Sequence, residues 1–190
     1  MELEPEQFKR FLPLPVTLIT TVNPKGVRNG APYSCVMPIL RPLNLIAIAS
    51  ALPRDTLRNI RETHEFVVNV IGRPGFREAM SCAKDYPPEV DEMAEAGLET
   101  APARKVLAPR IQNAIGWIEA DLEREIRGKD YAVVIGRVLC SEVNDRYWKD
   151  EKLSEDPLVM LFPHFRTIGA PAAKRDEFPM CSAHSVPEPS

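Results

Sequence analysis

The sequence is dominated by short apolar runs rich in β-branched residues, each bounded by residues that favour turns. The first run covers residues 15–22 and ends in a turn at residues 23–26, and others follow at residues 27–37, 43–50 and 65–71. Such runs are typical of β-strands, and a short turn between two of them favours an antiparallel hairpin. The 19 prolines, about twice the usual proportion, suit strand ends and turns better than a helical bundle.

The second half of the chain continues this pattern. Strands are expected over residues 114–125, 131–143 and 157–162, with a turn at residues 128–130. Within the first of these strands, apolar residues alternate with Glu119, Asp121 and Glu123. This alternation predicts a half-exposed antiparallel strand whose charged face meets solvent.

Helices are expected in fewer places. Residues 53–63 share apolar positions on one helical face, and Asp55 or Thr56 is expected to cap the first turn. Short helices are expected over residues 76–82 and 90–96, the second closed by Gly97 as a C-cap, whereas residues 101–110 are expected to be extended. The order of elements favours a mainly β fold with a closed or partly open barrel.

Composition narrows the domain organisation and the classes of partner. The length suits one domain, expected over residues 1–170, and the Pro-, Ala- and Ser-rich residues 171–190 are expected to form an extended or partly disordered tail. A net charge of −3 argues against a nucleic-acid binder that relies on a broad basic surface. No apolar run approaches the roughly 18 residues of a membrane span, and the acidic N-terminus lacks the basic region of a secretion signal. We therefore expect a cytoplasmic protein that does not contact membranes.

The four cysteines are expected to be free thiols. None lies in a C-x-x-C pair, so neither a metal site nor a thioredoxin-type redox pair is indicated. A reducing compartment would keep each of them unpaired.

The start of the helix expected after residue 53 offers the groups that a phosphate needs. Arg54 supplies a cation, Thr56 a hydroxyl, and the helix N-terminus supplies backbone N–H groups next to Asp55. Ser50, at the end of the preceding strand, could add a second hydroxyl. An ordinary helix cap with surface charges would show the same residues, so both interpretations stay open from these residues alone.

Several segments, taken in order, resemble the flavin reductase-like family, of which flavoredoxin is a member. They are residues 16–22, Asn29 to Ser34 (NGAPYS), Arg54 to Ile60 (RDTLRNI) and residues 65–70. The similarity continues at residues 90–98, 109–111 and 128–143, and it covers roughly residues 10 to 170. It implies an FMN-binding split β-barrel with antiparallel Greek-key topology and a few short helices.

The resemblance also assigns roles to residues. Arg54, Asp55 and Thr56, with Ser50, would bind the FMN phosphate. Asn29, Ala31, Pro32, Tyr33 and Ser34 would run along the flavin, where small residues at positions 30 and 31 would let backbone amides approach the ring. A β-bulge at a sheet edge would account equally well for the glycine and proline of that segment. Cys35 would lie near the ring, unless it is only a small buried residue, and His164 and Phe165 would lie near the flavin from the last strand.

The implied chemistry is that of the cofactor, because hydride transfer from NADH or NADPH to flavin N5 needs no acid–base residue of the protein. No G-x-G-x-x-G segment follows a strand, so a separate dinucleotide-binding domain is not expected. Three functions stay open: an NAD(P)H-dependent reductase of free flavin or another acceptor, a flavoredoxin-like electron carrier with a redox protein partner, and a non-catalytic FMN-binding module. A homodimer with FMN near the subunit interface is expected, as is common in this fold, and residues 86–110 are expected to shape one wall of the flavin site. The electron donor, the acceptor and the tightness of FMN binding are not indicated by the residues.

Overall fold

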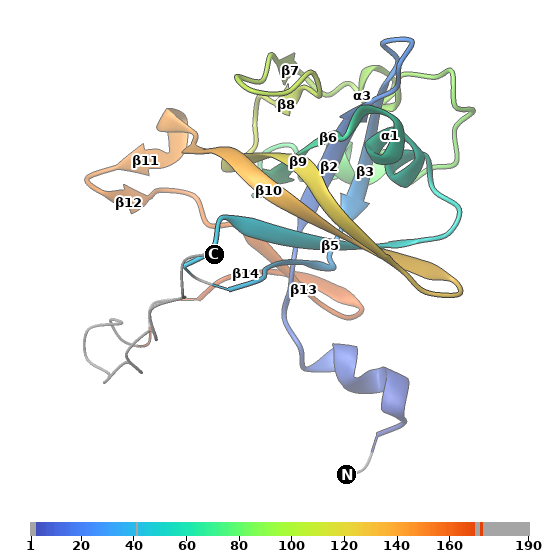
Figure 1. Cartoon of the computed structure of the whole chain (residues 1–190). Helices are drawn as coiled ribbons and strands as arrows, with labels where there is room; N and C mark the ends of the chain where they lie inside the picture. The colour runs from blue at the N-terminus through green and yellow to red at the C-terminus, as the bar shows by residue number, and fades with distance from the viewer. Residues whose placement is uncertain (1–2, 41, 170–171, 173–190) are drawn as a thin grey trace.

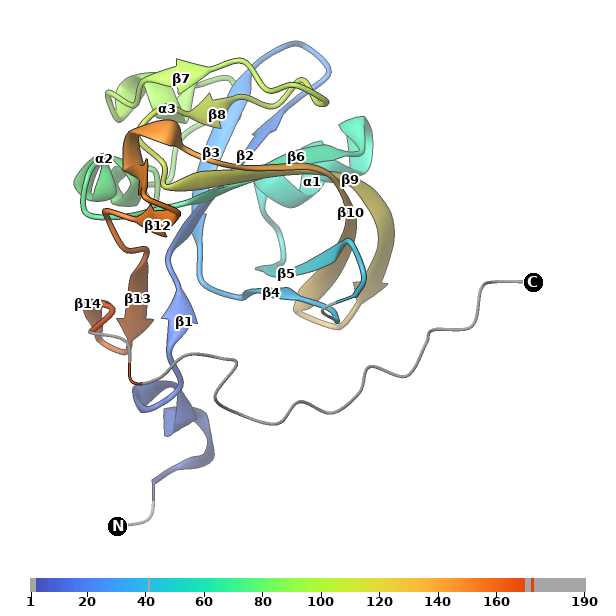
Figure 2. The ribbon, with the colours of Figure 1, turned by 90° about the vertical axis from the view of Figure 1, so that its left-hand side faces the viewer.

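The computed structural model describes residues 3–40, 42–169 and 172. Seven antiparallel strands form one sheet in the order β3-β2-β6-β9-β10-β5-β4. The sheet curls into a half-open barrel with β3 and β4 at its two edges, as Figure 2 shows. The expected mainly β, split-barrel fold is therefore confirmed. Of the tail expected over residues 171–190, all but Ala172 lies outside the described residues.

The strands of the curled sheet match the apolar runs of the sequence. They are β2 (Thr17–Val22), β3 (Arg28–Tyr33), β4 (Val36–Pro38), β5 (Leu45–Ala51), β6 (Glu65–Val70), β9 (Gly116–Arg127) and β10 (Tyr131–Val143). The run at residues 27–37 forms two strands instead of one, because the chain leaves the sheet at Ser34 and Cys35. This break separates the two edges of the barrel.

Smaller elements surround the barrel (Figure 1). The other strands are β1 (Leu14–Pro15), β13 (Leu158–Leu161) and β14 (His164–Thr167) in one sheet, the pair β7 (Thr100–Ala101) and β8 (Arg110–Ile111), and the pair β11 (Trp148–Lys149) and β12 (Lys152–Leu153). The helices are η1 (Pro5–Arg10), α1 (Asp55–Thr63), α2 (Phe76–Ser81), α3 (Glu92–Glu95) and η2 (Asp145–Tyr147). Among the residues described, no helix is long and apolar enough to cross a bilayer.

Helix α1 packs its apolar face into the barrel. Leu57 and Ile60 are each 1% exposed and join the main core with Ile19, Ile48 and Phe66. The helix contacts β2, β3 and β6, which holds its first turn beside β3. The burial of these side chains therefore fixes where the N-terminus of α1 points.

The segment with α2 and α3 covers the free edge of β3. Met93 of α3 is fully buried in a second core with Leu18 and Ile71. A Cβ atom on Gly30 would lie 2.9 Å from Met93 Cγ, so glycine at this position lets α3 pack closely against the strand. The small size of Gly30, which was expected to let a backbone amide approach a flavin ring, lets α3 approach β3.

The interpretation of β9 as half-exposed is wrong at Glu119, which is 0% exposed. Its carboxylate accepts hydrogen bonds from the backbone N–H groups of Arg104 and Lys105 and pairs with the guanidinium of Arg110. Residues 101–110 are accordingly not one extended segment, because only their ends lie in β7 and β8 and the part between folds over Glu119. A buried carboxylate with these partners anchors the loop to the sheet.

Candidate functional site

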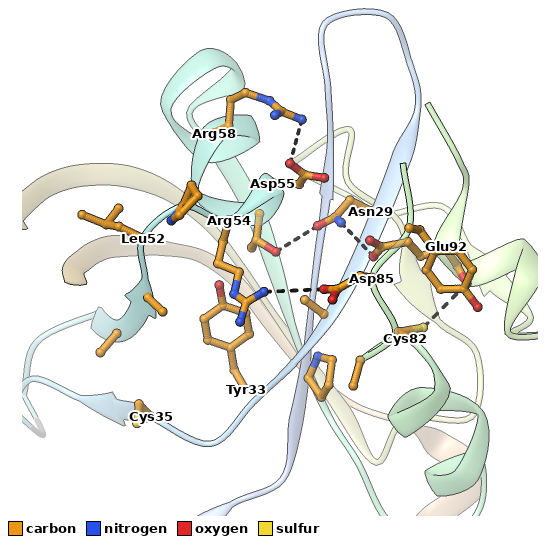
Figure 3. Close-up of a pocket in the computed structure, with 18 of the residues that line it drawn as sticks. Asn29, Tyr33, Cys35, Leu52, Arg54, Asp55, Arg58, Cys82, Asp85 and Glu92 are labelled. Carbon is orange, nitrogen blue, oxygen red and sulfur yellow. Dashed lines mark hydrogen bonds and ion pairs between the residues drawn. The ribbon is translucent and has the colours of Figure 1, made fainter. Parts of the chain in front are cut away.

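A cavity of about 990 Å³ lies between β3, the start of α1 and the segment that follows α2 (Figure 3). This volume is at the upper end of the usual range for small-molecule sites. Nine of the twelve residues expected to bind a cofactor line it, namely Asn29, Ala31, Pro32, Tyr33, Ser34, Cys35, Arg54, Asp55 and Thr56. The two sequence segments that carried the prediction are thus brought together in one cavity.

The N-terminus of α1 opens onto this cavity. Its N-cap residue is Arg54, in an extended conformation, and it makes no side-chain capping hydrogen bond. The expectation that Asp55 or Thr56 caps the helix is therefore wrong. A helix whose first N–H groups lack a side-chain partner attracts anions, through both hydrogen bonding and the helix dipole. The guanidinium of Arg54 is largely exposed and has only a loose contact, at 4.0 Å, with the exposed Asp85.

The charge of the lining is positive. Six basic side chains (Arg54, Arg58, Arg61, Lys84, Arg127 and Lys129) and three acidic ones (Asp55, Asp85 and Glu92) line the cavity. Two of the basic groups are engaged, since Arg58 pairs with Asp55 at 2.9 Å and Arg61 with Glu125. The remaining surplus favours a ligand with negative charge, such as a phosphate ester.

Asn29 joins four elements at the floor of the cavity. Its Oδ1 accepts hydrogen bonds from the hydroxyls of Thr56 in α1 (2.9 Å) and Thr21 in β2 (3.2 Å). Its Nδ2 donates to Glu92 Oε2 in α3 (2.8 Å), as Figure 3 shows. The backbone N–H of Gly30 donates to the same oxygen at 3.0 Å. Asn29 therefore fixes the relative positions of β2, β3, α1 and α3.

These bonds change the expected role of two groups. Thr56 is 2% exposed and its hydroxyl proton is directed to Asn29, so only its backbone N–H remains as a donor to a phosphate. The N–H of Gly30, expected to approach a flavin ring, is bonded to Glu92. Asn29 and Glu92 thus accept hydrogen bonds from two donors that were expected to bind the cofactor.

Tyr33 extends the polar wall toward the end of β5. Its hydroxyl lies 2.8 Å from Ser50 Oγ, which is 4% exposed and stands behind the cavity instead of lining it. Burial raises the pKa of Tyr33, and the hydroxyls of Ser50 and Thr56 and the charge of Arg54 offset part of that rise. The phenol is therefore a neutral hydrogen-bonding group at ordinary pH.

Two buried titratable groups come from the segment over β3. Burial raises the pKa of the Glu92 carboxyl to about 7, with smaller contributions in the same direction from Asp55 and Asp91 and opposing hydrogen bonds from Gly30 and Asn29. Burial, with the nearby Glu92 and Asp91, raises the pKa of the Cys82 thiol to about 12. Cys82 is therefore a protonated, unreactive thiol, whereas Glu92 changes charge near neutral pH.

Of the other residues expected at the site, one lines the cavity and two do not. Cys35 is exposed and lines the cavity, on the opposite side from Cys82 in Figure 3. His164 and Phe165 lie on β14, outside the residues that line the cavity, and the Phe165 ring packs edge-to-face on Phe76 with centroids 4.8 Å apart. Within one chain, the structure does not bring these two residues to the site.

Sequence reasoning missed part of the lining. Cys82, Lys84, Asp85 and Tyr86 line the cavity from the segment after α2, Arg127 lies at the end of β9, and Lys129 lies in the β9–β10 turn. Of the wall expected from residues 86–110, only Tyr86 and Glu92 take part. The only signal for Glu92 was its position inside the segment at residues 90–98 that resembles the family.

Comparisons with known proteins give the family and the fold. A sequence model of the "flavin reductase like domain" family matches residues 8–169. An uncharacterized protein of Methanothermobacter thermautotrophicus is 43% identical over 178 residues, which span 86% of this chain and 84% of that protein.

Two solved structures illustrate the shared fold. Flavoredoxin of Desulfovibrio vulgaris superposes with a TM-score of 0.81 at 21% identity, covering 92% of this chain and 97% of the other. The NADH:FAD oxidoreductase SgcE6 of Streptomyces globisporus C-1027, solved with NAD and FAD fragments, gives a TM-score of 0.75 at 17% identity, covering 91% and 100%. At these identities the likeness concerns the fold.

Proposed function

The chain belongs to the flavin reductase-like family, and from this premise we propose that it is an FMN-dependent oxidoreductase that accepts electrons from NADH or NADPH. Membership of the family implies a flavin as cofactor or substrate. The single observation that carries the choice of FMN is the uncapped N-terminus of α1, with Arg54 beside it, inside a cavity of about 990 Å³. A phosphate monoester suits this terminus.

The residues present fit FMN on chemical grounds. Arg54 and the first-turn N–H groups of α1 would hold the phosphate, with Asp55 and Thr56 contributing backbone donors. Residues 31–35, at and just beyond the end of β3, would lie along the rest of the cofactor, where Pro32 presents no N–H and Ala31 leaves room. Tyr33 and Ser34 would supply hydroxyls. Bound FMN would supply the redox chemistry, accepting a hydride and passing electrons to a second acceptor.

Two observations support a nicotinamide nucleotide as the electron donor. The Streptomyces oxidoreductase, which has a similar fold, is named for NADH and FAD. Its structure was solved in complex with NAD and FAD fragments. In this chain, the cavity of about 990 Å³ is large for a small-molecule site, and Lys129 at its lining forms no ion pair with any residue that the structure describes. A nicotinamide nucleotide stacking on the flavin would use that space, and free flavin or a redox protein would then take the electrons.

The phosphate site is tested by replacing Arg54. Titration of flavin-free protein with FMN, followed by flavin fluorescence, should show a Kd raised roughly ten- to hundredfold in Arg54→Ala, because a charged hydrogen bond contributes roughly 1.5–3 kcal/mol. Arg10→Ala is the matched control, since Arg10 is exposed on η1 and does not line the cavity. Equal affinities in Arg54→Ala and wild type would place the phosphate elsewhere.

A second candidate is a flavoredoxin-like electron carrier. The observation that favours it is the exposed Cys35 at the cavity, within a fold that matches flavoredoxin. Stopped-flow mixing of the FMN-loaded protein with NADH and with NADPH separates the candidates. Rapid loss of the flavin absorbance band supports the reductase. Reduction by dithionite or a protein donor, but by neither nucleotide, supports the carrier.

A homodimer is part of the proposal. The exposed apolar residues Met37, Ile39 and Leu40 follow closely in sequence on Cys35, which lines the cavity, and a second copy would cover them. Light scattering coupled to gel filtration should give twice the mass of the chain. A monomer at every concentration would remove this part of the proposal.

A further inference from the structure

Glu92 is the buried one of the three acidic residues that line the cavity, with 8% of its surface exposed. One oxygen, Oε2, accepts both the Asn29 amide at 2.8 Å and the Gly30 backbone N–H at 3.0 Å. The nearest basic residue on β3, Arg28, pairs with the neighbouring Asp91 instead. The carboxylate is thus held by neutral donors and not by a cation.

Charged and titratable groups face Glu92 from each neighbouring element. Asp55 lies at the start of α1. Asp91 precedes Glu92 in sequence and is paired with Arg28 of β3. The Cys82 thiol lies 3.7 Å from the Glu92 backbone oxygen. The carboxylates of Asp55 and Asp91 disfavour a negative charge on Glu92, as does burial. The carboxyl therefore lies close to the balance between its two protonation states at neutral pH.

We propose that Glu92 is a positioning residue of the flavin site, whose carboxyl group holds Asn29 and Gly30 in place and takes up a proton when the flavin phosphate binds. This inference rests on the proposed FMN site. A phosphate at the N-terminus of α1 would add negative charge beside Asp55, whose carboxylate already disfavours a negative charge on Glu92. The flavin would also remove water from the cavity, and both effects favour the neutral carboxyl.

The positioning role is inferred from the hydrogen bonds that connect Glu92 to α1 through Asn29. Glu92 orients the Asn29 amide so that Asn29 Oδ1 accepts the Thr56 hydroxyl at the first turn of the helix. Glu92→Gln keeps an oxygen that can take the place of Oε2 and accept both bonds, but it cannot bind a proton. Glu92→Met has a similar length and removes the acceptor, which leaves the Asn29 amide and the Gly30 N–H without a partner.

Isothermal titration of FMN at pH 7.5, in two buffers of different ionisation enthalpy, measures the number of protons bound with the flavin. A phosphate ester is already a dianion at this pH and contributes little. Wild type should take up roughly half a proton or more, and Glu92→Gln close to none. Glu95→Gln is the matched control, since Glu95 lies exposed on the same helix, and it should behave as wild type.

The same titrations test whether Glu92 holds Asn29 and Gly30 in position. Between pH 6.5 and 8.5 the FMN affinity of wild type should fall several-fold, while that of Glu92→Gln stays nearly constant. Glu92→Met should bind FMN at least about fivefold more weakly than Glu92→Gln at every pH. Equal proton uptake in wild type and Glu92→Gln would overturn the proton linkage, and equal affinity in Glu92→Met and Glu92→Gln would overturn the positioning role. Failure of wild type to bind FMN at all would instead refute the proposed function.

Discussion

Replacing Glu92 by Gln should change how the stability of the flavin-free protein depends on pH. In the folded protein, burial raises the pKa of Glu92 to about 7 from an ordinary 4.5. The folded state therefore binds more protons than the unfolded state between these two values. As pH rises through this window, the contribution of Glu92 to the free energy of unfolding falls, and above about pH 7 the loss is complete.

The magnitude follows from the size of the pKa change. A shift from 4.5 to about 7 corresponds to about 3 kcal/mol of lost stability at pH 8 relative to pH 4.5. This is an upper bound, because any water that reaches the carboxyl reduces it. Gln at this position keeps an acceptor for Asn29 and Gly30 and has no titrating proton, so it escapes the loss.

Urea unfolding of the flavin-free protein at pH 5, 6, 7 and 8 measures the effect. The stability of Glu92→Gln relative to wild type should rise by about 2–3 kcal/mol across this range. The exposed Glu95→Gln should follow wild type at every pH. A difference between Glu92→Gln and wild type that does not change with pH would refute the assignment of the titrating group.

Three further changes separate stability from binding. Arg110→Met leaves the fully buried Glu119 without its cation, so it should lower the free energy of unfolding by about 3–5 kcal/mol. The folded fraction should keep its FMN affinity. A loss under 1 kcal/mol in urea unfolding would contradict the anchoring role of this pair. Cys35→Ser should leave the stopped-flow rate of flavin reduction by NAD(P)H unchanged, because hydride transfer needs no thiol, and a slowed reduction would favour a redox role for Cys35. Phe165→Ala should cost roughly 1 kcal/mol of stability through the lost contact with Phe76, without changing the FMN Kd measured by fluorescence.

The strands and α1 could be predicted from sequence because local pattern and tertiary burial agree. The β-branched run in β2 is buried at every position, and Leu57 and Ile60 fall on the one face of α1 that packs into the barrel. The position of Arg54 at a helix N-terminus that opens onto the cavity was predictable for a related reason. A basic residue and free backbone N–H groups at the start of a helix can be recognised from local sequence, whereas the partners of the Thr56 and Ser50 hydroxyls, Asn29 and Tyr33, come from β3.

The errors arise where partners come from distant segments. Glu119 alternates with apolar residues as an exposed residue would, but the loop before β8 and Arg110 bury and neutralise it. Glu92 was not singled out from the sequence, because its partners Asn29 and Gly30 lie more than 60 residues earlier in the chain. No local pattern encodes these contacts.

The central claim, that the cavity between β3 and α1 is an FMN site, is tested most directly by identifying the flavin that the protein holds. The purified protein is incubated with FMN, freed of unbound ligand by gel filtration and heated, and the released flavin is identified by chromatography. We predict a yellow protein that releases FMN in near-equimolar amount, and much less from Arg54→Ala. A colourless wild-type protein that retains no FMN would contradict the claim.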